Sequence, residues 1–196
     1  MTTDPLVGHS SPVHCVAISS DGTRIISGSA DHTVRMWDTQ TGAQMGKPYT
    51  GHSSFVYGLA FTLDGTRFVS GSIDMTLKLW DTKKQALVIG GPLEWHSDLI
   101  WSVAFSPDRA CLASGSSKAV LLRDTRSHSC LGKIASSHTQ PIRSIKLSPC
   151  GTRLISGSDD NTVRLWEIKG GSSVLELIGH SSNVSAVAFS LPTGPA

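Results

Sequence analysis

Residues 8–38 read GHSSPVHCVAISSDGTRIISGSADHTVRMWD, and the chain repeats this stretch with small changes. A second copy, GHSSFVYGLAFTLDGTRFVSGSIDMTLKLWD, fills residues 51–81, and residues 137–167 read SHTQPIRSIKLSPCGTRLISGSDDNTVRLWE. Similarity at a fixed period indicates one structural unit that stacks on its neighbours. The period is 42 to 44 residues, as five histidines mark: His9, His52, His96, His138 and His180.

Each copy contains short runs of β-branched residues with partial alternation of apolar and polar side chains, which predict strands. In the first copy these runs are residues 13–19, 24–29 and 33–38. The pairs Asp21-Gly22 and Asp64-Gly65 predict two-residue hairpin turns, because glycine adopts the positive φ that such turns need. A fourth, weaker run follows in every unit, at residues 45–50, 86–89, 130–135 and 174–178.

Four strands in about 43 residues make one propeller blade, and the Gly-His…Trp-Asp frame is its signature. The chain therefore resembles the WD-repeat β-propeller family over almost its whole length. The resemblance implies an all-β fold in which residues 1–196 form a single propeller segment. It implies four complete four-stranded blades, expected at residues 8–50, 51–94, 95–136 and 137–178.

A partial fifth unit ends the series, because residues 179–190 hold only His180 and one predicted strand, residues 184–190. Closed propellers have about four to eight blades, so four blades and a stub predict an open or incomplete ring. Exposed strand edges favour pairing with another chain. Three alternatives stay open: an open arc, self-association of two copies through exposed blade edges, or a fragment of a longer propeller.

In the WD-repeat family a His, a strand Ser, a turn Asp and a Trp form a hydrogen-bonded tetrad in each blade. The chemistry is sound, because a buried Asp needs donors and a Trp supplies an indole N–H while filling space. Three units match this pattern, and the resemblance implies structural tetrads of His9, Ser27, Asp31 and Trp37, of His52, Ser70, Asp74 and Trp80, and of His138, Ser156, Asp160 and Trp166.

The third unit departs from the pattern. It keeps His96 and Ser114, has no Asp at the tetrad position, and has Arg123 where Trp is expected. Its turn between the second and third strands is one residue short, and Arg109 replaces a turn glycine, which tolerates positive φ better. We expect this unit to be the least stable, or to be altered for contact with a partner.

Charge and composition exclude several classes of protein. The 17 Lys and Arg against 15 Asp and Glu leave a net charge of +2, which argues against nucleic-acid or membrane-surface partners. No export signal or apolar run of about 20 residues is present, so we expect an intracellular protein, cytoplasmic or nuclear and not secreted. No metal site and no cofactor are expected, because four cysteines without a C-x-x-C pair are too sparse: Cys15, Cys111, Cys130 and Cys150.

The recurrence of Asp, His and Ser argues against catalysis. A catalytic triad occurs once in an active site, whereas this set occurs three times at the spacing of the repeat and brings a Trp with it. The sequence has no G-x-S-x-G elbow and no phosphate-binding loop. No catalytic residue is therefore predicted, and a hydrolase remains only a third-ranked hypothesis.

Positions that vary between repeats are free to serve contact. The second residue of the first strand of each unit varies between repeats, and in a propeller it lies near the channel mouth on one face. Aromatic and Arg side chains dominate the hot spots of protein interfaces. The predicted partner-binding residues come from this position and from two residues before it: His14, Phe55, Tyr57, Leu99, Trp101 and Arg143. Residues before the tetrad Asp are expected on the same rim: Ala30, Ile73 and Asp159.

Two functions follow as hypotheses. The first is a non-catalytic protein–protein interaction scaffold that presents a propeller face to other proteins. The alternative is a sensor or regulatory repeat array that forms part of a larger signalling protein, for example one with a nucleotide-binding module. An upstream coding sequence with a phosphate-binding loop would favour the alternative.

Overall fold

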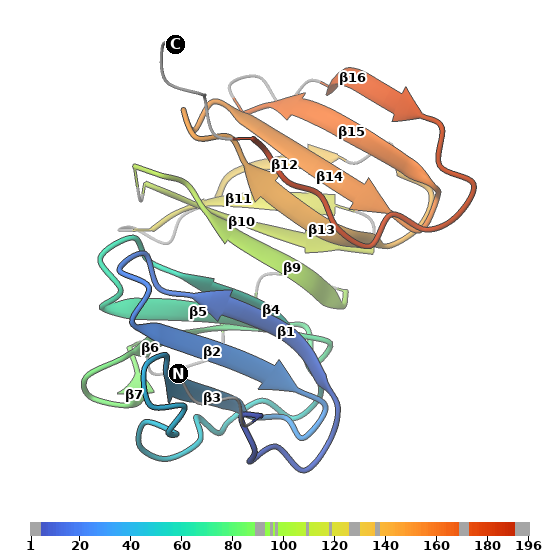
Figure 1. Ribbon diagram of the computed structural model, residues 1–196. Helices are drawn as coiled ribbons and strands as arrows, with labels where there is room; N and C mark the ends of the chain where they lie inside the picture. Colours follow the sequence, from blue (N-terminus) through green and yellow to red (C-terminus); the bar gives the residue numbers. More distant parts are fainter. Residues whose placement is uncertain are drawn as a thin grey trace, which may run out of the picture. The chain divides into compact units, whose positions relative to one another are not determined.

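The computed structural model describes residues 5–88, 93–94, 96, 98–108, 110–117, 119–125, 130–135, 138–168 and 173–190. Sixteen strands run through these residues, which contain no helix (Figure 1). The expectation of an all-β fold is confirmed. In this part of the chain there is thus no helix with the length and apolar character that a membrane crossing requires.

The strands form four antiparallel sheets. The first sheet has the order β1 (Val13–Ile18), β2 (Arg24–Ser29), β3 (Val34–Asp38). The second has the order β4 (Val56–Phe61), β5 (Arg67–Ser72), β6 (Thr76–Asp81), β7 (Ala86–Leu87), and β8 (Leu93–Glu94) also pairs with β6. The third comprises β9 (Ile100–Phe105), β10 (Cys111–Ser116), β11 (Ala119–Asp124) and β12 (Cys130–Ala135). The fourth comprises β13 (Ile142–Leu147), β14 (Arg153–Ser158), β15 (Thr162–Glu167) and β16 (Ser173–Ile178).

The chain divides into two compact units, residues 1–103 and 104–196. The core of the first unit joins its first two sheets through buried side chains that include Ile26, Met36, Val56, Phe68 and Trp80. The core of the second unit joins its sheets in the same way through side chains that include Val120, Leu122, Ile142, Leu154 and Trp166. Each unit therefore buries apolar faces of neighbouring sheets against each other.

The turn that follows the first strand differs from the sequence prediction. Ser19 N–H donates to Arg24 O at 2.9 Å and Gly22 N–H donates to Ser19 O at 2.9 Å, so the connection is longer than two residues. Only the glycine has positive φ, 69°, whereas a two-residue turn of type I′ needs it at both central positions. The Asp21 carboxylate holds the wider loop, because it accepts hydrogen bonds from Thr23 N–H and from the hydroxyls of Ser19 and Thr23.

Some of the predicted fourth strands are present and others are not. Residues 130–135 are β12 and residues 173–178 are β16, close to prediction. Residues 45–50 are not a strand, since only isolated bridges join Gln44 to Trp37 and Tyr49 to Val34. Between the bridges Gly46 has a φ of 72° and Pro48 has no N–H to donate, which explains the break. The first sheet therefore has three strands, and the expectation of four in every sheet is wrong there.

The predicted strand at residues 184–190 is also absent. The chain runs past β14 as an irregular segment, drawn without an arrow after β16 in Figure 1. Alternating apolar residues predict which side chains are buried, but a strand forms only by pairing with another. None of the described strands pairs with this segment.

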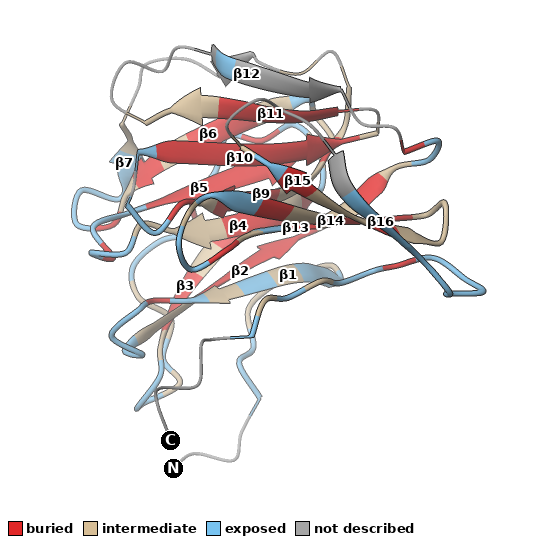
Figure 2. Ribbon diagram, turned by 90° about the horizontal axis from the view of Figure 1, so that it is seen from above, coloured by how far each residue is buried: buried red, intermediate tan, exposed pale blue. Residues whose placement is uncertain are grey.

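Burial within the sheets follows their order. β2, β5 and β10, each second in its sheet, are mostly buried, whereas β1 is exposed along most of its length (Figure 2). The first strands of the later sheets are more buried than β1, although their sequences are closely similar.

Candidate functional site

One chain of hydrogen bonds recurs in the first, second and fourth sheets. In the first sheet Trp37 Nε1–H donates to Ser27 Oγ at 2.8 Å, and Ser27 Oγ lies 2.8 Å from His9 Nε2. His9 Nδ1 lies 2.7 Å from Asp31 Oδ2. The structure brings together the four predicted residues in each of these sheets, and the same distances in the other two sets lie between 2.7 and 2.8 Å. In each of these sheets, the tetrad hydrogen bonds link the segment before the first strand to the second strand, to the turn that follows it and to the third strand.

The protonation state of the tetrad histidine follows from its burial and from the hydrogen-bond donors and acceptors around it. Burial lowers the pKa of His138 from its ordinary value of 6.5, although its hydrogen bond to Asp160 opposes this effect. A neutral ring then donates from Nδ1 to Asp160 and accepts at Nε2 from the Ser156 hydroxyl, whose oxygen accepts from Trp166. In this arrangement the Trp166 indole N–H, the Ser156 hydroxyl and the His138 Nδ1–H each have an acceptor.

The tetrad carboxylates are stabilised as anions. Burial raises the pKa of Asp160, but hydrogen bonds from Thr162 and His138 outweigh burial and lower it to about 2. In the same way, hydrogen bonds hold the pKa of Asp31 and that of Asp74 well below the usual range despite burial. Each carboxylate also accepts a backbone N–H from the residue after the tetrad His: Ser10, Ser53 and Thr139.

The third sheet differs, as its sequence indicates. Arg123 pairs with Leu112, the place that Trp37 holds opposite Ile25 in the first sheet, so Arg replaces Trp in register. The turn after β10 is short, and Ser116 Oγ spans it by bonding to both Ala119 O and Ala119 N. Arg109 lies outside the described residues.

A β-bulge marks the second residue of the first strand in three sheets. The register shifts between Val13 and Cys15, between Val56 and Gly58, and between Ile142 and Ser144. The residues at the shifts are His14, Tyr57 and Arg143, which the sequence singles out for contact. A bulge adds an unpaired residue and turns its side chain away from the regular pleat.

The rim beside each bulge is held by one recurring backbone bond. The residue before the tetrad Asp donates its N–H to the carbonyl of the residue two before the bulge. These pairs are Ala30 to Pro12 at 2.9 Å, Ile73 to Phe55 at 3.1 Å and Asp159 to Pro141 at 3.0 Å. The three positions that the sequence assigns to the rim are therefore adjacent within each of these sheets.

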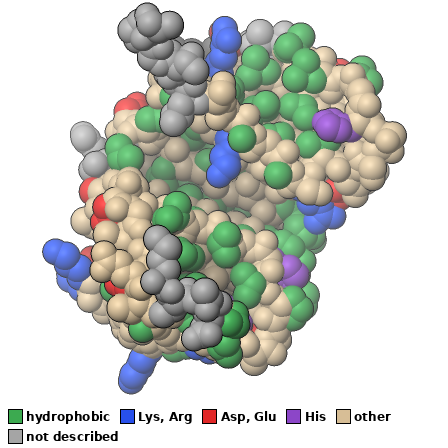
Figure 3. All heavy atoms as spheres, viewed as in Figure 1, with side chains coloured by type: hydrophobic (Ala, Val, Ile, Leu, Met, Phe, Trp, Pro, Cys, Tyr) green, Lys and Arg blue, Asp and Glu red, His purple; other side chains and the backbone are tan. Residues whose placement is uncertain are grey.

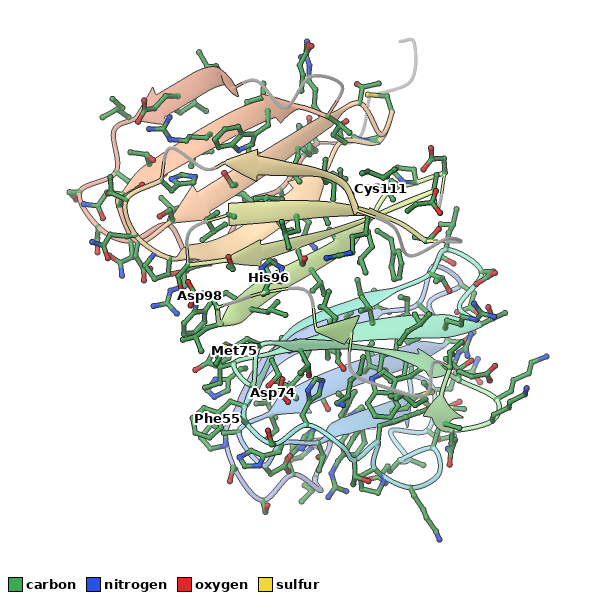
Figure 4. The ribbon with its side chains drawn as sticks, turned by 180° about the vertical axis from the view of Figure 1, so that it is seen from behind. Phe55, Asp74, Met75, His96, Asp98 and Cys111 are labelled. Carbon is green, nitrogen blue, oxygen red and sulfur yellow. The ribbon has the colours of Figure 1, made fainter. Side chains whose placement is uncertain are left out.

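In the first unit the rim side chains form one aromatic row, made of His32, Phe55, His14, Tyr57 and Trp101. His32 lies 5.8 Å from Phe55, and Phe55 lies 5.9 Å from His14, measured between ring centroids. His14 stacks on Tyr57 at 4.3 Å, and Tyr57 meets Trp101 edge-on at 4.8 Å. His14 and Phe55 are exposed, and the other three are partly exposed. Figure 4 shows Phe55 and Met75 at the same end of the second sheet as Asp74.

The other two predicted contact residues, Leu99 and Arg143, are not aromatic and make polar contacts of their own. Leu99 is half-buried, and its N–H donates to the Asp98 carboxylate. Arg143 belongs to the second unit, where its guanidinium pairs with Asp159 at 2.6 Å and 2.8 Å. A partner would have to compete with this carboxylate for Arg143.

Sequence analysis missed His32. It follows the tetrad Asp, and its φ of 68° is shared by the equivalent residues Met75 and Asn161. The signal was available, because this position also varies between repeats, but it falls in a turn with no strand pattern to give a side-chain direction.

The cysteines differ in burial and in the pKa of their thiols. Among the described residues no three His, Cys, Asp or Glu side chains converge as a metal ion would require. Burial raises the pKa of Cys15 to about 12 and that of Cys111 to about 11, so these thiols are unreactive at neutral pH. Hydrogen bonds from Ser148 and Thr152 lower the pKa of the exposed Cys150 to about 7.

One protein family matches most of the chain. The family model described as WD domain, G-beta repeat matches residues 2–38, 44–81, 89–124 and 128–167. The chain is similar to the small ribosomal subunit protein RACK1 of Caenorhabditis elegans, at 41% identity over 189 residues, 94% of this chain and 57% of that protein. It is also similar to the nuclear distribution protein nudF of Emericella nidulans, at 30% identity over 195 residues, 97% of this chain and 44% of that protein.

A shorter match covers 64 residues of the human dynein assembly factor with WD repeat domains 1, at 36% identity, which is 33% of this chain and 15% of that protein. The matched segments thus cover between 15 and 57% of the length of these three curated relatives.

Proposed function

The chain belongs to the WD40 family, whose repeat is the WD domain, G-beta repeat, and from this premise we propose that it is a non-catalytic protein-interaction scaffold. Its partners would be other proteins, and the binding surface would be the aromatic row of His32, Phe55, His14, Tyr57 and Trp101. Two of the three relatives above, the ribosomal subunit protein and the dynein assembly factor, are subunit or assembly proteins by name, which agrees with such a role.

The observation that supports this proposal most is the aromatic row itself. Five rings lie in contact at one rim, and the bulges in β1 and β4 turn two of them out of their strands. Rigid, partly exposed rings give a large contact area at low cost in side-chain entropy, and such residues dominate hot spots. A partner would cover the row with apolar or aromatic side chains.

The tetrads would serve as the support for this rim. Each Asp is fixed by its His and Thr neighbours, and the residue on either side of it forms part of the rim: Ala30 and His32 flank Asp31, and Ile73 and Met75 flank Asp74. The proposed role of the tetrads is therefore structural, with no chemistry on a substrate.

A proteomic capture experiment tests the scaffold. The bait chain is compared with Tyr57→Ala/Trp101→Ala, and with Leu63→Ala/Leu131→Ala as a control that alters two exposed apolar residues outside the row. We expect at least one protein to be captured by the wild type and the control and lost with the row variant. Retention of every partner by a folded row variant, with folding checked by circular dichroism, would exclude the row as the binding surface.

The alternative, a sensor or regulatory array within a larger signalling protein, stays a prediction. It would use the same rim, but the response would pass to another domain, such as a nucleotide-binding module. An intracellular location, cytoplasmic or nuclear, belongs to both proposals.

A further inference from the structure

A glycine of the second strand of each sheet receives aliphatic side chains from the chain that follows. A methyl group at Gly28 would lie 2.7 Å from Cγ1 of Val56, and one at Gly71 would lie 2.7 Å from Ile100 and 3.0 Å from Val103. In the second unit Gly115 receives Ile142 and Ile145, and Gly157 receives Val184 and Val187. We call each of these glycines a seat, because only a missing Cβ leaves room for the side chains.

Among the described residues, one aliphatic pair of the repeat meets no glycine of this kind. Val13 and Val16 hold in β1 the places that Val56 and Leu59 hold in β4, and 48% and 67% of their surfaces are exposed. Val56 is fully buried, and so are Ile100 and Ile142 at the same place in β9 and β13. Ile18 is also exposed on β1. Val13, Val16 and Ile18 form what we call the leading surface, which is shaped to enter a seat.

The seat at Gly157 is occupied by an irregular segment instead of a strand. Residues 183–190 hold Val184 and Val187 at this glycine without joining the sheet. Two hydrogen bonds tie the segment down, Val184 N–H to Ser158 O at 3.0 Å and Val187 N–H to Ser144 Oγ at 3.2 Å. Beside it an open, mostly apolar groove of 440 Å³ remains between Phe189 and the side chains of Leu147 and Pro107.

The strands next to this seat are uncovered as well. Leu177 pairs with Val163 in the fourth sheet, and Tyr49 pairs with Val34 in the first sheet. Leu177 and Tyr49 are therefore equivalent residues. Tyr49 is 3% exposed because Phe68 and Trp80 cover it, whereas Leu177 is 46% exposed. Hydrophobic side chains gather on the surface over β14 to β16 (Figure 3). Gly157, Leu165 and Leu177 form what we call the trailing surface.

We propose that the leading surface of one copy of this chain packs on the trailing surface of a second copy, where Val13 and Val16 displace residues 183–190 from Gly157. The contact would repeat the one that β4 makes with β2, where Val56 enters the seat at Gly28 and Phe68 covers Tyr49. The leading surface supplies the same side-chain classes, with Ile25 at the place of Phe68.

A second copy is the occupant that both surfaces specify. The seat reads Ser-Gly-Ser in all four sheets, so a surface that fits one seat fits another. Arg24 lies over the Phe61 ring at 5.9 Å in the existing contact, and Arg153 holds the place of Arg24 in the fourth sheet with half of its side chain exposed. Arg153 would cover Ile18 of the second copy in the same way.

Self-association of the full chain tests this proposal. Light scattering on a sizing column, over a range of loading concentrations, should show the 20.8 kDa chain in equilibrium with particles of two or more copies, because a pair still has one free leading surface and one free trailing surface. Val16→Asp places a charge in the leading surface, and Leu177→Asp places one in the trailing surface. Both residues are exposed, so both variants should fold, and each should weaken association about tenfold or more.

Mixing the two variants distinguishes this contact from others. Val16→Asp keeps an intact trailing surface and Leu177→Asp keeps an intact leading surface, so the mixture should form a one-to-one complex that neither variant forms alone. Val187→Asp should loosen the segment at Gly157 and tighten association about tenfold. Met75→Asp, an exposed change on neither surface, is the control. A chain that stays monomeric at all concentrations, or a mixture with no complex, would overturn the proposal.

Discussion

The imidazole of His14 stacks on the phenol ring of Tyr57, with 4.3 Å between the ring centroids and 15° between the ring planes. The two rings come from equivalent positions in β1 and β4, so the stack links two sheets at their rim. Stacked pairs contribute about 0.5–1.5 kcal/mol beyond the area they bury.

A double-mutant cycle should measure this contact. We expect His14→Ala and Tyr57→Ala to show a coupling of about 0.5–1 kcal/mol in the free energy of unfolding, measured in urea. Tyr57→Phe keeps the ring and should retain nearly all of the coupling to His14. Additive effects of the two alanine variants would show that the stack contributes no stability.

Removing the shared hydroxyl of a tetrad should be far more costly. In Ser70→Ala the buried Trp80 Nε1–H loses its acceptor and His52 Nε2 loses its donor, so we expect about 2–4 kcal/mol of destabilisation. The neighbouring exposed Ser53→Ala should change stability by less than about 0.5 kcal/mol. Equal stability of the two variants in urea unfolding would mean that the tetrad hydroxyl is not needed.

The tetrads should also make the fold sensitive to acid in two steps. Burial lowers the pKa of His138 below 6.5, so below that pH the unfolded chain takes up a proton before the folded chain, and stability falls. Asp160 has a folded pKa of about 2 against an ordinary 3.8, so its contribution is present above about pH 4 and is lost as pH falls toward 2. Urea unfolding at a series of pH values should show both losses. Asp160→Asn should make the lower one smaller, because Asp31 and Asp74 still contribute to it.

Backbone strain at Met75 offers a stabilising change. Its φ is 68°, a region that favours Gly and Asn, and Asn161 holds the equivalent place with a φ of 67°. We expect Met75→Asn to raise the free energy of unfolding by about 0.5–1 kcal/mol. The reverse change, Asn161→Met, should lower it by a similar amount. If Met75→Asn lowers stability, the side chain contributes more than the strain removes.

Thiol reactivity should separate the cysteines. Cys150 is exposed with a pKa of about 7, whereas burial raises the pKa of Cys15 to about 12. Alkylation by iodoacetamide should therefore proceed rapidly at Cys150, with a rate that rises through about pH 7. Cys150→Ser should abolish this fast phase, as followed by mass spectrometry. A fast phase that survives the substitution would place the reactive thiol elsewhere.

The tetrads could be predicted from sequence because each demands particular side chains at fixed spacing. His, Ser, Asp and Trp supply donors and acceptors in one order, so three copies of the pattern define which residues meet. The row could be predicted in part, since His14 and Tyr57 hold a repeated position, but which rings touch depends on how neighbouring sheets pack. His32 joins the row from a turn whose backbone direction no local pattern reveals.

The outer and final strands could not be predicted for a different reason. Residues 45–50 carry suitable side chains, but Gly46 and Pro48 interrupt the ladder. Residues 184–190 alternate as the other first strands do, and Val184 is buried as the pattern predicts. Backbone pairing depends on a neighbouring strand, and a pattern within one segment contains no information about that neighbour.

The four seats also bear on how such a chain can change in length. Each sheet offers the same glycine to the segment behind it, and each following segment offers aliphatic side chains of similar size. Deleting or duplicating one whole repeat of about 43 residues would leave matching surfaces at the new junction. A deletion or duplication of any other length would separate an aliphatic side chain from its glycine. Recombination between the copies therefore adds or removes modules that already fit.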